Sequence, residues 1–224
     1  MHLYIDSADV TAIGALARHP AIAGVTTNPT LQRAAQLDDA GLRRFLGRTL
    51  SDGARAVHVQ VKARDADEIV EQGASYAALA EAGRIFVKVP ATEAGLDAVS
   101  RLSDLGVPCT VTAAFELEQV VFAQACGARY VAPYLGRMND AGIDGLQRVR
   151  EMQTVLERYG EAPPDCRLLV ASVRSREDLL ALLEIGVGAV TLKPELVRRV
   201  LNHEATIRSE EAFLRDAAAA DRPG

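Results

Sequence analysis

Several features that define common protein classes are scarce or missing in this 224-residue sequence. No apolar run approaches the roughly 18 residues of a membrane-spanning helix, and no charged segment followed by an apolar one opens the chain. The three cysteines lack CxxC spacing and the four histidines lack paired spacing such as HExxH, so we expect no metal site. These absences predict a cytoplasmic protein with reduced cysteines and no contact with membranes.

Positive charge is also in short supply. A net charge of −5 and a pI near 5.5 argue against nucleic-acid binding, which usually needs a basic surface. Only three of the 25 basic residues are lysines, namely Lys62, Lys88 and Lys193. Lysine, unlike arginine, can lose its proton when desolvated and then act as a nucleophile, so its rarity suggests that it is kept for chemistry. A composition bias is the alternative explanation, and the positions of the three lysines bear on the choice.

What the sequence does contain is a regular alternation of short β-branched runs with longer amphipathic segments. Strands are expected at 3–7, 23–29, 56–63, 84–90, 107–114, 129–136, 167–173 and 189–194. The clearest helical segments are 65–83, 92–106, 145–160 and 175–186, and several end on glycine, at Gly83, Gly106, Gly127, Gly160 and Gly186. Eight strands, each followed by a helical segment, predict an α/β fold of the (β/α)8 TIM-barrel type.

An open doubly wound sheet is the main alternative fold. Such a sheet usually has fewer strands, and no GxGxxG motif follows the first strand here. No linker composition divides the chain, so residues 1–224 are expected to form a single domain. Within it, roughly 204–224 should be an extra C-terminal helix and tail, fraying from about residue 216.

Polar residues fall where the expected strands end, which is where barrel enzymes carry their active sites. Alternate residues of a strand face opposite sides, so Lys88 should point into the barrel while Val87 and Val89 pack outward. Lys62 and Lys193 also lie at the ends of expected strands, which weakens the composition-bias explanation, although ion pairs at the rim of the mouth remain an alternative for both. The same rule places further candidates at the mouth: Asp6, Thr26, Asn28, Gln60, Thr112, Tyr134 and Ser172. His58 lies deeper in its strand and is expected to be a hydrogen-bonded core histidine.

This set of residues could support Schiff-base chemistry, because a lysine amine in a water-poor barrel can attack a carbonyl group. Tyr134 and Asp6 are candidates for moving protons, and Gln60 and Thr112 for holding a water molecule. Arg174 lies just past the seventh expected strand and Arg137 past the sixth. A guanidinium matches phosphate oxygens, so both are candidate phosphate ligands together with Ser172. Ordinary interior hydrogen bonds and solvated loop charges are the alternative roles.

The segments "LYIDSADV", "AGVTTNPT", "FVKVPATEAGL", "YVAPYLGR" and "LLVASVRS" resemble the transaldolase family, and most closely its small branch, which includes fructose-6-phosphate aldolase. The resemblance implies a (β/α)8 barrel, a class I mechanism without metal or other cofactor, and a homo-oligomer, a ring-stacked decamer in which the C-terminal helix reaches a neighbour. It implies that Lys88 forms the Schiff base, with Asp6 and Asn28 on the hydroxyls of a dihydroxyacetone unit. It further implies that Thr112 helps to bind the catalytic water and that Ser172 and Arg137 bind phosphate. We also assign Thr26 to substrate binding.

Two positions separate the branches of the family that the chain resembles. Transaldolases have glutamate on the third strand and phenylalanine on the sixth, whereas Gln60 and Tyr134 resemble the aldolase branch. A phenol can transfer protons, which helps to release a free ketone. The expected function is therefore a class I aldolase that uses dihydroxyacetone as donor and glyceraldehyde 3-phosphate or a similar aldehyde as acceptor. Arg174 looks more like the transaldolase phosphate site, and neither branch predicts Lys62 or Lys193 at the mouth.

Two alternatives to this function stay open at this point. The first is a transaldolase that moves a dihydroxyacetone unit between sugar phosphates. The second is a non-catalytic barrel that binds a sugar phosphate. All three functions share a small sugar or sugar phosphate as the ligand.

Overall fold

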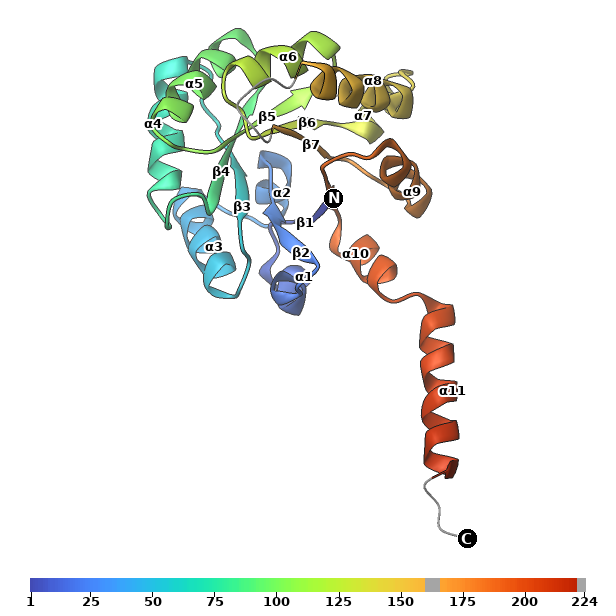
Figure 1. Ribbon diagram of the computed structural model, residues 1–224. Helices are drawn as coiled ribbons and strands as arrows, with labels where there is room; N and C mark the ends of the chain where they lie inside the picture. The colour runs from blue at the N-terminus through green and yellow to red at the C-terminus, as the bar shows by residue number, and fades with distance from the viewer. Residues whose placement is uncertain (160–165, 221–224) are drawn as a thin grey trace.

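The computed structural model describes residues 1–159 and 166–220, without the side chains of residues 219 and 220, and its strands close into a parallel barrel (Figure 1). Each strand pairs with the next in chain order, and the last pairs with the first. The strands are β1 (His2–Asp6), β2 (Ile22–Thr26), β3 (Val57–Gln60), β4 (Ile85–Pro90), β5 (Cys109–Ala114), β6 (Tyr130–Pro133), β7 (Arg167–Val170) and β8 (Ala189–Leu192). The expected TIM barrel is confirmed, and the open doubly wound sheet is excluded.

Helices follow the strands and cover the outside of the barrel (Figure 1). They are α1 (Val10–Ile13), the 3-10 helix η1 (Gly14–Arg18), α2 (Pro29–Ala34), α3 (Asp39–Ser51), α4 (Ala66–Ala77), α5 (Glu93–Asp104), α6 (Leu117–Ala125), α7 (Leu135–Asp140), α8 (Gly145–Arg158), α9 (Arg176–Ile185), α10 (Pro194–Leu201) and α11 (Glu204–Ala220). The side chains of Asp65, Thr92 and Ser175 accept backbone hydrogen bonds at the starts of α4, α5 and α9. Gly160 and residues 221–224, expected as a helix end and part of a fraying tail, lie outside the described residues.

The outward faces of the strands pack against the helices, as the alternation of residues predicts. Val87 and Val89 on β4 are fully buried. Gly73 lets α4 lie close to this strand, because a Cβ at that position would stand 3.0 Å from Cγ1 of Val87. Lys88, between the two valines, therefore points to the inside of the barrel.

The inside of the barrel is filled at its N-terminal end by four rings, those of Tyr4, His58, Phe86 and Tyr130. The rings of His58 and Phe86 stack with centroids 4.4 Å apart, and the hydroxyls of Tyr4 and Tyr130 are 3.0 Å apart. His58 is buried as expected, and its Nδ1 lies 2.9 Å from Oγ1 of Thr110, but its Nε2 has no partner among the described residues. Burial, and then the charge of the lysine on β4, lowers the pKa of His58. This layer closes one end of the barrel and leaves the C-terminal end for a site.

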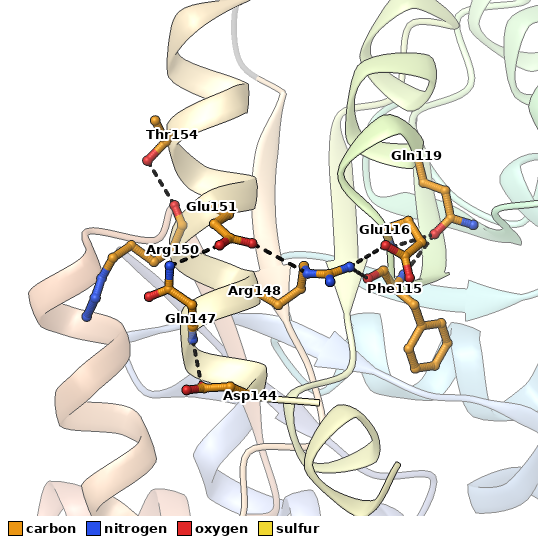
Figure 2. A network of polar contacts seen from close by, with 9 residues as sticks. All are labelled: Phe115, Glu116, Gln119, Asp144, Gln147, Arg148, Arg150, Glu151 and Thr154. Atoms are coloured by element: carbon orange, nitrogen blue, oxygen red, sulfur yellow. Dashed lines mark hydrogen bonds and ion pairs between the residues drawn. The ribbon is translucent and has the colours of Figure 1, made fainter. Parts of the chain in front are cut away.

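The loop after β5 is held in place at this open end by a polar network (Figure 2). Oε1 of Gln119 on α6 accepts hydrogen bonds from the backbone N–H groups of Phe115 at 2.8 Å and Glu116 at 3.0 Å. Arg148 on α8 donates to the carbonyl oxygen of Phe115 at 3.0 Å and forms an ion pair with Glu116. The loop is thus tied to two helices, which fixes the position of the Phe115 ring.

The C-terminal helix α11 extends away from the barrel (Figure 1). It continues to Ala220, so residues 216–220, expected to belong to a fraying tail, are part of the helix. Phe213 and Leu214 on this helix are 71% and 65% exposed. No helix in the described part of the chain is long and apolar enough to cross a membrane.

Candidate active site

A cavity of about 260 Å³ opens at the C-terminal end of the barrel. Its lining comes from the ends of six strands and the loops after them: Asp6, Asn28, Lys88, Tyr134, Arg137, Ala171, Ser172, Val173, Arg174, Thr191 and Lys193. Eight of these eleven residues are among those expected at the mouth. The barrel topology brings them together from positions far apart in the sequence.

Lys88 lines this cavity and is only 2% exposed. Its Nζ donates a hydrogen bond of 3.2 Å to the backbone carbonyl oxygen of Thr27 at the end of β2. Among the described residues, no carboxylate forms an ion pair with it. A structural lysine this deeply buried would normally be paired with an acid. The expected alternative of a salt-bridged structural lysine therefore lacks its acidic partner in the described residues.

Asp6 lies on the opposite side of the barrel, at the end of β1. Oγ1 of Thr26 donates to Oδ1 of Asp6 at 2.8 Å and lies 2.7 Å from the hydroxyl of Thr191. Burial raises the pKa of Asp6. This rise is opposed by the charge of Lys88, by the hydrogen bond from Thr26, and by the charges of Lys193 and Arg137. Thr26, expected to bind substrate, is fully buried and is not part of the cavity lining.

Tyr134 and Thr112 form a hydrogen-bonded pair on neighbouring strands, with their hydroxyl oxygens 2.9 Å apart. Tyr134 lines the cavity, whereas Thr112 is fully buried behind it. The ladder between β5 and β6 is irregular after Thr112, where Ala113 has a φ of 57°. Such a bulge re-aims the side chains around it. Phe115 contacts the Tyr134 ring edge-on at 6.5 Å, so the loop fixed by Arg148 also supports this phenol.

The three candidate phosphate ligands all line the cavity, but they differ in how available they are. Arg137 lies over the ring of Tyr134, with its guanidinium carbon 4.7 Å from the ring centroid. Ser172 has a φ of 59°, a conformation that is strained for a residue with a side chain. Arg174 makes two hydrogen bonds to Asp140, of 2.7 and 2.5 Å. The guanidinium of Arg174 is therefore already bound by a carboxylate. Its hydrogen bonds lower the pKa of Asp140.

Asn28 and Gln60 lie at the ends of neighbouring strands. The side-chain oxygen of Asn28 accepts a 3.0 Å hydrogen bond from the N–H of Leu31 and so caps α2. Gln60 is level with Lys88 in the β3–β4 ladder and is half-buried, but it is not part of the cavity lining. Gln60 could therefore reach a substrate in the cavity only through a water molecule.

The structure separates the two remaining lysines. Lys193 follows β8 and lines the cavity. Lys62, expected with it as a residue of the mouth, lies elsewhere and lines a different hollow with Glu68 and Glu71. β3 ends at Gln60, three residues before the expected end at residue 63, so Lys62 lies beyond the strand, and its backbone N–H donates a hydrogen bond to the side-chain oxygen of Gln72 on α4.

Sequence reasoning missed Ala171, Val173 and Thr191 as residues of the cavity. Thr191 could have been found, because it precedes Lys193 by two residues and so shares its strand phase. Ala171 and Val173 are ordinary apolar residues and carry no signal of their own. No group of three or more His, Cys, Asp or Glu side chains in residues 1–159 and 166–220 is arranged to hold a metal ion.

Comparison with known proteins agrees with this geometry. A family described as Transaldolase/Fructose-6-phosphate aldolase matches residues 3–222. The chain is similar to a probable transaldolase of Ruegeria pomeroyi, with 34% identity over 221 residues, which cover 99% of this chain and 98% of the relative. It is also similar to a probable transaldolase of Symbiobacterium thermophilum, with 33% identity over 221 residues, covering 98% of each.

Proposed function

The chain belongs to the transaldolase/fructose-6-phosphate aldolase family and is an enzyme of the aldolase/transaldolase type, and on this premise we propose that it is a class I aldolase acting through Lys88. The donor is dihydroxyacetone, and the acceptor is glyceraldehyde 3-phosphate or a similar aldehyde. The observation that supports this most is a lysine in the lining of the mouth cavity that is 2% exposed and has no carboxylate partner among the described residues. Family membership also argues against the non-catalytic alternative.

In the proposed reaction, the Lys88 amine attacks the ketone carbon of the sugar, and loss of water leaves an iminium ion. Asp6 takes the proton from the hydroxyl on the fourth carbon. The bond between the third and fourth carbons then breaks, its electron pair moves toward the iminium to form an enamine, and the aldehyde leaves. A proton returns to the third carbon, and water releases free dihydroxyacetone and the amine.

The proposed roles of the other residues follow from their positions. Tyr134 holds the water that hydrolyses the Schiff base and exchanges protons with it, and Thr112, whose hydroxyl lies 2.9 Å from that of Tyr134 behind the cavity wall, helps to bind this water through the phenol. Asn28 contacts the hydroxyls of the donor unit, and Gln60 acts through water. Arg137 and Ser172 bind the phosphate at the acceptor end.

A transaldolase is the second candidate function. It is favoured by the names of the relatives, which are probable transaldolases. Against it stands Tyr134, since a phenol within reach of the enamine promotes protonation and release of the ketone rather than transfer to a second sugar.

Incubation with fructose 6-phosphate alone separates the two functions. An aldolase forms glyceraldehyde 3-phosphate without any second sugar, and we expect this product from the wild-type protein and none from Lys88→Met. Lys62→Met is the matched control, because it removes a lysine outside the cavity and should retain full activity. If product appears only when erythrose 4-phosphate is added, the protein is a transaldolase and the aldolase proposal fails.

We also propose that the protein is a homo-oligomer, with a decamer as the expected form, in which α11 packs against a neighbouring copy. The support is the exposed apolar surface of this helix, which carries Phe213 and Leu214 and extends away from its own barrel (Figure 1). Large apolar side chains clustered on a surface commonly mark an interface.

A further inference from the structure

The mouth cavity carries more positive charge than the proposed chemistry uses. Its lining includes four cationic side chains, those of Lys88, Arg137, Arg174 and Lys193, and a single carboxyl group, that of Asp6. Lys88 is committed to the covalent step, and Asp6 to proton transfer. Three cations therefore remain to interact with whatever part of the substrate lies away from the reacting carbon.

The three remaining cations are not equally free. Both outer nitrogens of Arg174 bond to Asp140, at 2.7 and 2.5 Å, so binding an anion would require this bidentate pair to break or to share its charge. The guanidinium of Arg137 lies over the face of the Tyr134 ring and forms no ion pair with any residue that the structure describes. Lys193 forms no ion pair or side-chain hydrogen bond with any other described residue.

The order of the strands places Lys193 and Arg137 on two sides of Ser172. Arg137 follows β6, Ser172 follows β7 and Lys193 follows β8, which are consecutive in the barrel. Neighbouring strands are about 4.8 Å apart, so the backbones after β6 and β8 are on the order of 10 Å apart. Both side chains line the same cavity, and a lysine and an arginine on two sides of a gap of this size can hold one phosphate group between them.

The surroundings of Lys193 strengthen this assignment. The same side chain also lines an adjoining hollow of about 350 Å³, together with Arg199 and Arg174. Arg199 likewise has no acidic partner among the described residues, and Glu195 is the one acidic residue in the lining of this hollow. The side of the mouth next to β8 is therefore cationic, and a substrate anion is attracted there.

We infer that Lys193, together with Arg137 and above Ser172, binds the phosphate of the acceptor aldehyde, and that Arg174 is held away from it by Asp140. This inference rests on the proposed aldolase function and makes Lys193 a specificity-determining residue for phosphorylated acceptors. A phosphate carries close to two negative charges at neutral pH, which two cations neutralise.

Binding of inorganic phosphate to the full-length protein, measured by calorimetry, tests the inference without any turnover. Lys193→Met should weaken phosphate binding about tenfold or more, the loss expected for one charge-assisted hydrogen bond. Lys193→Arg should restore most of it, and Lys62→Met should match the wild type. Arg174→Met should have a smaller effect than Lys193→Met. Unchanged phosphate affinity in Lys193→Met, or a larger loss in Arg174→Met, would overturn the inference.

A kinetic comparison distinguishes anion binding from a general effect of charge on Asp6. With dihydroxyacetone as donor, the ratio of kcat/KM for glyceraldehyde 3-phosphate to that for glyceraldehyde should fall about tenfold in Lys193→Met. An equal loss with both acceptors would mean that Lys193 acts through Asp6, and the inference would be wrong. Borohydride trapping of dihydroxyacetone on Lys88 needs no phosphate and therefore tests the proposed function separately. If the phosphate and acceptor experiments contradict the inference but the variants still form the adduct, the inference fails and the proposed function stands.

Discussion

Replacement of Tyr134 by phenylalanine separates the catalytic role of its hydroxyl from its structural one. The hydroxyl bonds to Thr112 at 2.9 Å, and Thr112 is fully buried. Removing it leaves a buried hydroxyl without that partner, at a cost of about 1–3 kcal/mol of stability. In a protein of this size each kcal/mol lowers Tm by about 2–4 °C. Tyr134→Phe should therefore melt a few degrees below the wild type but remain folded at 25 °C.

The effect of the same substitution on turnover should be much larger than its effect on folding suggests. General acid–base catalysis contributes about 10²- to 10⁴-fold in rate, which corresponds to roughly 3–5 kcal/mol of the activation barrier. We predict that kcat for cleavage of fructose 6-phosphate falls at least about 100-fold in Tyr134→Phe. Trapping of dihydroxyacetone on Lys88 should persist, because the amine itself is unchanged.

Tyr130→Phe is the matched control for this experiment. Tyr130 is 7% exposed, as Tyr134 is, and its hydroxyl also bonds to a buried partner, that of Tyr4 at 3.0 Å. It lies in the ring layer at the closed end of the barrel and does not line the cavity. Tyr130→Phe should show a similar fall in Tm with kcat nearly unchanged. Equal losses of kcat in the two variants, or full activity in Tyr134→Phe, would refute the assignment of Tyr134 as a proton-transfer residue.

Two further predictions concern stability and assembly. Burial raises the pKa of Asp6, so the folded protein binds a proton there more tightly than the unfolded chain, and this contribution to stability is lost as pH rises from the ordinary pKa to the folded one. The free energy of unfolding in urea is measured from about pH 4, near the ordinary pKa of aspartate, to about pH 8. The wild type should lose stability relative to Asp6→Asn as pH rises, and parallel curves for the two proteins would contradict this. Deletion of residues 204–224 removes the exposed side chains of Phe213 and Leu214 and should convert the protein to a smaller species in light scattering. An activity assay confirms that the deletion variant is folded. An unchanged mass of this folded variant would show that α11 is not the interface.

Much of the fold and part of the site could be predicted from the sequence because both depend on local patterns. The alternation of Val87, Lys88 and Val89 determines which of them faces inward once β4 is recognised, and the structure agrees. The convergence of Asp6 and Lys88 follows from the rule that barrel strands end at the same face. These inferences need only strand positions and phase, which β-branched residues and glycine-ended helices reveal.

The rest depends on contacts between segments that no local pattern encodes. The pairing of Arg174 with Asp140 joins α7 to the loop after β7, and its geometry exists only once both are packed. Lys62 shows a different limit, since the third strand was expected to end three residues later than β3 does, and Lys62 lines a separate hollow instead of the mouth cavity. The left-handed conformation of Ser172 was equally hidden, because such conformations are normally signalled by glycine.

The identity of the residue that carries the covalent intermediate tests the central claim most directly. The wild-type protein is incubated with dihydroxyacetone, reduced with borohydride and analysed by peptide mass spectrometry, in parallel with Lys88→Met and Lys62→Met. We predict one reduced dihydroxyacetone adduct, located on Lys88, in the wild type and in Lys62→Met, and none in Lys88→Met. An adduct on another lysine, or no adduct in a wild-type protein that still cleaves fructose 6-phosphate, would contradict the Schiff-base account.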